Sequence, residues 1–221
     1  MSDPLKVKVK VCCISSVSEA ALAVSYGADA LGFVSKMPSG PGVISDEKIL
    51  EIIKTVPSHI DKFLLTSETE SSEIIQQQEK FKPDTLQLVD EVSTEVYHDL
   101  KNKIPSVRIV QVVHVKDKSS AEYAIKISGF VDAILLDSGN PDLSVKELGG
   151  TGKVHNWNIS RMIREKVNVP VYLAGGLNAE NVKEAINTVS PYAVDLCSGV
   201  RTDGKLDESK LEKFFNAVRN T

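Results

Sequence analysis

A cysteine and an aspartate, each at the end of an apolar run, are the side chains in this 221-residue chain best suited to acid–base chemistry. Cys12 ends the β-branched run 7–11, and Asp137 ends the apolar run 133–136. A thiol can act as a base where positive charge stabilises its thiolate, and a partly buried carboxyl group stays protonated and can act as an acid. Cys12 could instead be a small buried hydrophobe and Asp137 a turn cap. Taken singly, neither residue establishes a catalytic role.

Small residues follow two strand-like runs near the C-terminal end. Gly175 and Gly176 come directly after the first of these runs, and Ser198 and Gly199 come after the second. Such residues let backbone N–H groups face an anion, and a following helix N-terminus adds a favourable dipole. One turn of this kind would only indicate a strand-to-helix connection. Two of them, after a seventh and an eighth strand, predict a phosphate site.

A third glycine cluster lies in a long irregular stretch after the sixth strand. Gly150, Thr151 and Gly152 precede a lysine, but the spacing does not match a P-loop. We predict a mobile flap over the ligand, with Thr151 and the backbone amides as contacts. A flexible surface loop is the alternative.

A lysine and an aspartate are expected to pair beneath this site. Alternation along the first strand places Lys10 and Cys12 on one face, and the valines between them suit the face that meets the helices. Asp195 lies two residues before Cys197 on the last strand, which closes against the first in a barrel. A buried lysine needs a partner, so we predict a Lys10–Asp195 pair.

Strand-like and helix-like segments alternate along the whole chain, which indicates βαβ units and a parallel sheet. The expected strands are Val7–Ile14, Ala28–Val34, Lys62–Ser67, Thr85–Val89, Val107–Val113, Val131–Asp137, Val169–Leu173 and Ala193–Cys197. Among the expected helices are Val17–Tyr26, Asp46–Thr55, Ser71–Phe81, Ser119–Ile127, Asn178–Thr188 and Asp207–Val218. We predict one domain over residues 1–221, a single (βα)8 TIM barrel of the α/β class. An open doubly wound sheet is the alternative.

Composition limits the partners and the location. The net charge is −4 with both signs mixed, and no basic block with interleaved aromatic residues predicts nucleic-acid binding. No apolar stretch approaches the roughly 20 residues of a membrane span, and the first residues do not resemble a signal peptide. The three cysteines lack metal-ligand or disulfide spacing. A cytoplasmic protein with no metal, nucleic-acid or membrane partner is expected.

Six motifs, in order and over nearly the whole chain, resemble those of the phosphoribosylanthranilate isomerase family. They are Val9-Lys10-Val11-Cys12-x-Ile14, Gly27-Ala28-Asp29-Ala30-Leu31-Gly32-Phe33, Leu135-Leu136-Asp137-Ser138, Gly149-Gly150-Thr151-Gly152, the run from Leu173 to Val182, and Val194-Asp195-x-x-Ser198-Gly199-Val200. Together they are specific, although any one alone would be weak.

The resemblance implies a (βα) barrel that catalyses an Amadori rearrangement in tryptophan biosynthesis without metal or cofactor. It implies that Cys12 is the general base taking the C2 proton and that Asp137 is the acid opening the ribose ring. It also implies that the two pairs of small residues bind the phosphate. The expected partner is a small phosphorylated sugar, and the chain is expected to be a monomer or a homodimer.

The chain departs from the family pattern around the expected aromatic carboxylate. Cys13 replaces a glycine, Val89 replaces a histidine, and the stretch 36–45 lacks the usual arginine. Either Lys36, His114 or Arg201 pairs with the carboxylate, or the substrate differs. The alternatives are therefore an enzyme acting on another phosphorylated aminoaldose or sugar phosphate, and a non-catalytic binder of phosphorylated ligands. Retention of both Cys12 and Asp137 argues against the binder.

Overall fold

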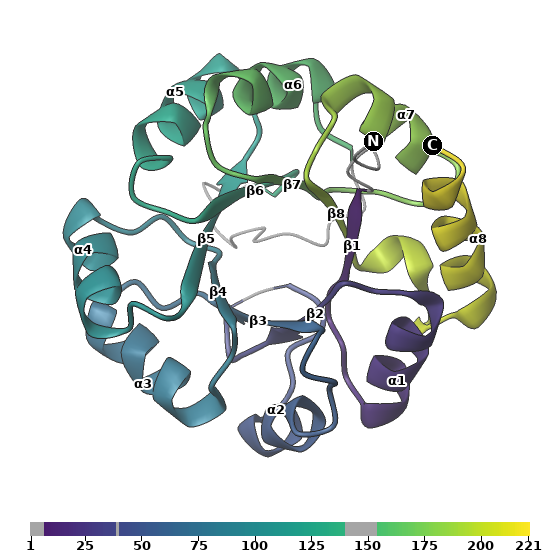
Figure 1. The fold of residues 1–221 in the computed structure, drawn as a ribbon, viewed down its shortest axis with the longest axis horizontal. Helices are drawn as coiled ribbons and strands as arrows, with labels where there is room; N and C mark the ends of the chain where they lie inside the picture. Colours follow the sequence, from purple (N-terminus) through teal and green to yellow (C-terminus); the bar gives the residue numbers. More distant parts are fainter. Residues whose placement is uncertain (1–6, 39, 140–153) are drawn as a thin grey trace, which may run out of the picture.

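The computed structural model describes residues 7–38, 40–139 and 154–221. In these residues eight parallel strands close into a barrel, with β1 hydrogen-bonded to both β2 and β8 (Figure 1). The strands are β1 (Lys8–Val11), β2 (Ala30–Val34), β3 (Asp61–Thr66), β4 (Thr85–Leu88), β5 (Arg108–His114), β6 (Ala133–Asp137), β7 (Val171–Leu173) and β8 (Ala193–Leu196). The predicted TIM barrel is confirmed, and the open doubly wound sheet is wrong, because β8 closes on β1.

Helices form the outer ring around the strands (Figure 1). They are α1 (Val17–Tyr26), α2 (Asp46–Ile53), α3 (Ser71–Phe81), α4 (Thr94–Lys103), α5 (Lys118–Ile127), α6 (Trp157–Lys166), α7 (Val182–Val189) and α8 (Glu208–Arg219). A short 3-10 turn, η1 (Ser198–Val200), and a small hairpin of β9 (Arg201–Thr202) and β10 (Lys205–Leu206) connect β8 to α8. None of the described helices is long and apolar enough to cross a membrane.

Side-chain hydrogen bonds mark the start of α1 and the turn before α7. At α1, Ser16 Oγ accepts a hydrogen bond from the Glu19 amide at 3.1 Å, as in a capping box, but the Glu19 carboxylate accepts from the Ser15 amide at 2.9 Å. The expected helix at Asn178 begins instead at Val182. Asn178 Oδ1 accepts hydrogen bonds from the Glu180 and Asn181 amides at 3.0 and 3.1 Å, which stabilises a turn there and delays the helix.

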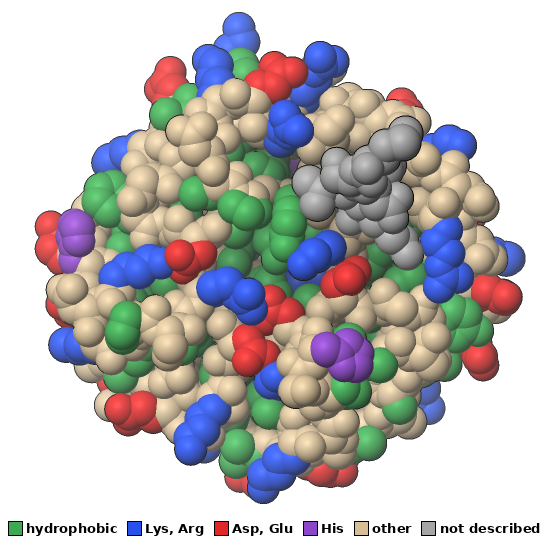
Figure 2. All heavy atoms as spheres, viewed as in Figure 1, with side chains coloured by type: hydrophobic (Ala, Val, Ile, Leu, Met, Phe, Trp, Pro, Cys, Tyr) green, Lys and Arg blue, Asp and Glu red, His purple; other side chains and the backbone are tan. Residues whose placement is uncertain are grey.

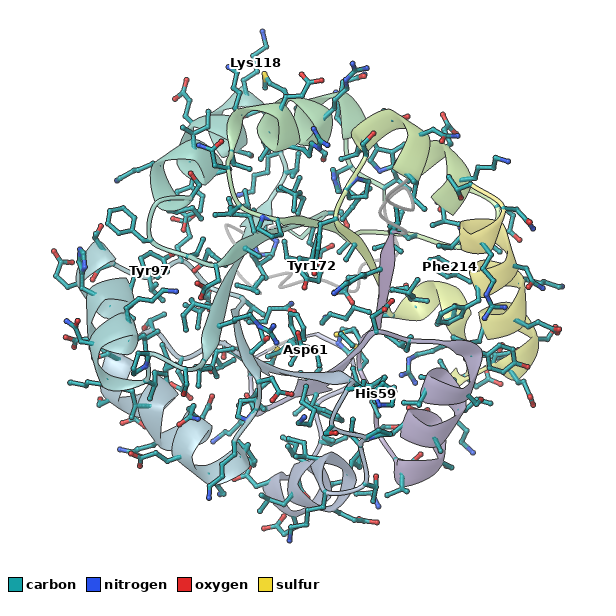
Figure 3. All side chains as sticks on the ribbon, viewed as in Figure 1. His59, Asp61, Tyr97, Lys118, Tyr172 and Phe214 are labelled. Atoms are coloured by element: carbon teal, nitrogen blue, oxygen red, sulfur yellow. The ribbon has the colours of Figure 1, made fainter. Side chains whose placement is uncertain are left out.

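The core has two layers, separated by the strands. On β1, Val9 and Val11 pack outward with the helices, whereas Cys12 belongs to the cluster inside the barrel. In Figure 3, Phe214 lies outside the ring of strands and Tyr172 lies near its centre. The alternation predicted for the first strand is therefore correct, and it directs Lys10 and Cys12 into the barrel.

The N-terminal end of the barrel, below the site, holds aromatic rings, an ion pair and a second pocket of about 570 Å³ including its open mouth. The rings of Phe63 and Tyr172 meet edge to face inside the barrel, with their centroids 5.6 Å apart. At the N-terminal ends of the strands, Arg108 pairs with Asp61 at 2.6 Å. Figure 2 shows acidic and basic side chains gathered over the middle of the barrel, where Figure 3 labels Asp61. TIM barrels bind their ligands at the C-terminal ends of the strands, so the site is expected at the opposite end from these residues.

Candidate active site

A pocket opens at the C-terminal ends of the strands. It encloses about 620 Å³ including its open mouth, which suits a small organic ligand. Its lining residues come from β1 to β4, β6, β7 and β8 and the segments that follow them: Cys12, Cys13, Val34, Met37, Gly40, Pro41, Leu65, Gln87, Val89, Asp137, Ala174, Gly175, Gly176, Leu177, Asp195, Leu196, Cys197 and Ser198. No lysine or arginine is among them in the part of the chain that the structure describes.

Cys12 lies just beyond the end of β1, buried to 5% exposure at the pocket wall. The strand ends at Val11, before the predicted Ile14, because Cys13 has φ +62° and leaves the extended conformation. Gly32 on the neighbouring strand makes room, since a Cβ there would lie 2.8 Å from Cys12 Sγ. The Cys13 side chain and the charge of Lys10 lower the pKa of the Cys12 thiol, despite the opposing effect of burial.

Lys10 supplies that charge from a fully buried position. Its Nζ lies 2.8 Å from Asp195 Oδ2 and 5.1 Å from the centre of the Phe63 ring. The other carboxylate oxygen, Asp195 Oδ1, is buried without a hydrogen-bond partner among the described residues, and Asp195 lines the pocket. Burial opposes the ammonium charge, but the carboxylate outweighs it and raises the pKa of Lys10. The structure thus contains the pair suggested by strand position, with Lys10 opposite Asp195 in the β1–β8 register.

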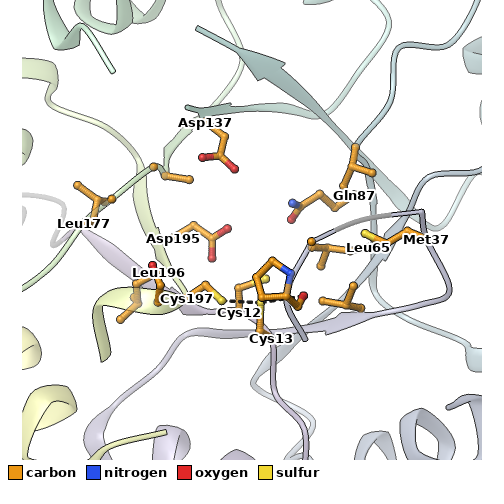
Figure 4. A pocket seen from close by; sticks show the side chains of 18 residues that line it. Cys12, Cys13, Met37, Leu65, Gln87, Asp137, Leu177, Asp195, Leu196 and Cys197 are labelled. Atoms are coloured by element: carbon orange, nitrogen blue, oxygen red, sulfur yellow. Dashed lines mark hydrogen bonds between the residues drawn. The ribbon is translucent and has the colours of Figure 1, made fainter. Parts of the chain in front are cut away.

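Asp137 ends β6 on another side of the pocket from the cysteines (Figure 4). Its Oδ1 accepts hydrogen bonds from the Ser138 amide at 2.7 Å and the Ser138 hydroxyl at 3.4 Å. Burial raises the pKa of Asp137, although these hydrogen bonds and Lys10 act in the opposite direction. The pocket therefore holds a thiol whose pKa is lowered and a carboxyl group whose pKa is raised, the directions required of a base and an acid.

The two predicted small-residue loops lie together at one edge of the pocket. Gly175 and Gly176 have φ of +82° and +64°, a conformation in which a side chain is strained. Both line the pocket with Ser198. Gly199 does not, but a Cβ at this position would lie 2.0 Å from the Leu177 carbonyl oxygen. Glycine at 199 is therefore what allows the β7 and β8 loops to pack against each other.

Two cationic residues expected at the substrate do not line the pocket. Lys36 is exposed on the segment after β2. Arg201 pairs with Glu19 at 3.0 Å and donates to the Cys13 carbonyl oxygen at 2.6 Å. Its guanidinium holds the end of β1 against the start of α1, which is why it does not face the ligand. The predicted flap residues Gly150, Thr151 and Gly152 lie outside the described residues.

Two polar side chains without an expected role from the sequence lie at or beside the pocket. Gln87 is 3% exposed on β4 and points into the pocket (Figure 4). Within the part of the chain that the structure describes, its Oε1 has no hydrogen-bond partner. His155 hydrogen-bonds Ser160 Oγ at 2.7 Å, and its Nδ1 faces Gly175, whose Cβ would lie 3.0 Å from it. Burial lowers the pKa of His155 to about 4, so its imidazole is neutral at pH 7. A glutamine inside an apolar strand was the available signal for Gln87.

Comparison with known proteins agrees with this geometry. The family model for N-(5'phosphoribosyl)anthranilate (PRA) isomerase matches residues 9–217. The chain belongs to this isomerase family. It is 36% identical to the N-(5'-phosphoribosyl)anthranilate isomerase of Methanosarcina acetivorans, an alignment that covers 98% of this chain and 95% of that relative.

Solved structures of the same family have the same fold. The Thermotoga maritima phosphoribosyl anthranilate isomerase superposes with a TM-score of 0.84 at 30% identity, over 97% of this chain and 100% of that one. A phosphoribosyl anthranilate isomerase in complex with reduced 1-(o-carboxyphenylamino)-1-deoxyribulose 5-phosphate superposes with a TM-score of 0.81 at 27% identity, with the same coverage. This chain is thus an enzyme of the isomerase family with a TIM-barrel fold.

Proposed function

We propose that this chain catalyses the Amadori rearrangement of N-(5'-phosphoribosyl)anthranilate, with Cys12 as general base and Asp137 as general acid. The proposal rests above all on the opposite pKa shifts of these two groups across one pocket. Asp137 protonates the ribose ring oxygen and opens the ring, leaving an imine. The Cys12 thiolate then removes the C2 proton, and the resulting enolamine becomes the ketose.

The phosphate end of the substrate is assigned to the loops after β7 and β8. Gly175, Gly176 and Ser198 line the pocket, and we assign their backbone amides to the phosphate, while Gly199 keeps the two loops in contact. Backbone amides in a left-handed turn bind an anion by forming a concave donor surface. This explains how a pocket without a lysine or arginine among its described lining residues can hold a phosphate.

The aromatic end of the substrate is assigned to the opposite rim, formed by the segments after β2, β3 and β4. Met37, Leu65 and Val89 give this rim an apolar surface. The Gln87 amide lies there, and we assign its Nε2 to the substrate carboxylate in place of the arginine and histidine of the family pattern. The amide N–H groups can donate hydrogen bonds to a carboxylate without adding a positive charge.

The test is a fluorescence assay of purified protein with N-(5'-phosphoribosyl)anthranilate generated in situ. The proposal predicts loss of substrate fluorescence that depends on enzyme concentration. A second substrate lacking the ring carboxylate, the corresponding phosphoribosyl aniline, should react with lower kcat/KM. Turnover of the aniline compound alone would overturn the assignment of the anthranilate substrate.

A further inference from the structure

Two thiols that the proposed mechanism does not use are in contact at the edge of the pocket. Cys197 Sγ lies 2.6 Å from Cys13 Sγ (Figure 4). Cys13 follows β1 and Cys197 follows β8, so the contact crosses the place where the first and last strands pair. Both residues line the pocket beside Cys12, and all three are free thiols.

The surrounding residues hold Cys13 in this position. Its φ of +62° is rare for a residue with a side chain, and Arg201 donates to its carbonyl oxygen at 2.6 Å. The Arg201 side chain is itself only 8% exposed and paired with Glu19. On another side a Cβ at Gly42 would lie 2.5 Å from Cys13 Cβ, so the segment after β2 packs closely against the thiol. The contact with Cys197 is therefore built into the packing.

Cys13 and Cys197 are better placed than Cys12 and Cys13 to form a disulfide. Adjacent Cα atoms are about 3.8 Å apart, whereas disulfides usually need at least about 4.4 Å. Residues 13 and 197 come from different strands and are free of that limit. Their sulfur atoms need to approach by only about 0.5 Å to reach bonding distance.

We propose that Cys13 and Cys197 are a site of reversible oxidation to a disulfide by a low-molecular-weight disulfide such as oxidised glutathione. Cys197 is the more exposed thiol. Its thiolate attacks the small disulfide, forms a mixed disulfide and releases one small thiol. Cys13 then attacks the Cys197 sulfur and displaces the second small thiol. Two electrons pass from the protein sulfurs to the small disulfide, and the two thiol protons end on the released thiols.

The disulfide would change the proposed catalytic base. Both Cys13 and Cys197 line the same pocket as Cys12, and the Cys13 side chain lowers the pKa of the Cys12 thiol, so joining the two sulfur atoms alters the surroundings of Cys12. Oxidation is therefore expected to lower kcat/KM at neutral pH at least about fivefold, and a dithiol should restore it. This consequence rests on the proposed function, whereas formation of the bond does not.

The bond is tested by mass spectrometry of the intact chain after equilibration in glutathione buffers of increasing oxidised fraction. The wild type should lose the mass of two hydrogen atoms, and tryptic mapping should link the peptides that contain residues 13 and 197. Cys12→Ser should still form the link, which assigns it to Cys13, whereas Cys13→Ser and Cys197→Ser should not. Absence of the link in folded wild type at the most oxidised ratio, or its persistence in Cys197→Ser, would overturn the proposal.

The consequence for catalysis is tested by the ratio of oxidised to reduced activity. In the wild type the oxidised protein should have about one fifth or less of the activity of the reduced protein. In Cys197→Ser, which cannot form the bond, the ratio should stay near one. A cross-linked wild type with full activity would overturn the catalytic consequence. If no variant or state isomerises the substrate, the mass measurement still decides whether the disulfide forms.

Discussion

Removing the charge of Lys10 is expected to destabilise the barrel far more than removing a surface charge. In Lys10→Met the Asp195 carboxylate stays fully buried without its partner, since Asp195 Oδ1 already lacks a hydrogen bond. Breaking a buried ion pair in this way costs about 3–5 kcal/mol. Lys48 is the matched control, because its Nζ lies the same 2.8 Å from Glu51 but the two side chains are 40% and 54% exposed. Lys48→Met should cost at most about 1 kcal/mol.

Urea unfolding at pH 7, followed by circular dichroism, measures both free energies of unfolding. The double variant Lys10→Met/Asp195→Leu should recover much of the loss, because no buried charge remains. A loss below about 1 kcal/mol in Lys10→Met would refute the reasoning. So would a double variant whose loss of stability equals or exceeds the sum of the losses in Lys10→Met and Asp195→Leu, since the two side chains would then not stabilise each other.

Three further perturbations test the site. Gly199→Ala should lower stability and raise KM, because the new Cβ would meet the Leu177 carbonyl oxygen at 2.0 Å; unchanged thermal unfolding and KM would contradict this packing. Gln87→Leu should raise KM about tenfold, because the substrate carboxylate loses the hydrogen-bond donor assigned to it, and unchanged KM would contradict the assignment. Stability should stay equal or rise, because the substitution removes an unpaired buried oxygen. The pH profile of kcat/KM should be bell-shaped, with the acidic limb set by Asp137 and the alkaline limb by Cys12. The acidic limb should lie above 3.8 and the alkaline limb below 9.0, the ordinary pKa values of the two groups, because the pKa of Asp137 is raised and that of Cys12 is lowered.

The periodic features of the sequence predicted the barrel well. Alternation in the first strand identified Lys10 and Cys12 as interior residues, because side chains of a strand alternate between its two faces. The same reasoning on the last strand suggested Asp195 as the partner of Lys10. These inferences needed only local pattern and the closure of a barrel.

Contacts between distant residues could not be predicted in the same way. No short sequence pattern indicates that Arg201 pairs with Glu19 and holds the end of β1. Arg201 follows the phosphate loop directly in sequence, which is why it is a candidate for the substrate carboxylate on sequence alone. The thiol contact between Cys13 and Cys197 likewise joins two loops far apart in sequence. The late start of α7 depended on whether the Asn178 side chain caps a helix or a turn, which the residue type leaves open.

The central claim is that Cys12 and Asp137 transfer the protons of one isomerisation. Its most direct test measures kcat/KM for N-(5'-phosphoribosyl)anthranilate in Cys12→Ala and Asp137→Asn, together with the affinity of each variant for reduced 1-(o-carboxyphenylamino)-1-deoxyribulose 5-phosphate. Loss of about 10²–10⁴-fold in kcat/KM, with affinity for the analogue retained within about tenfold, is the predicted result. Either folded variant turning over within about tenfold of the wild type would contradict the claim.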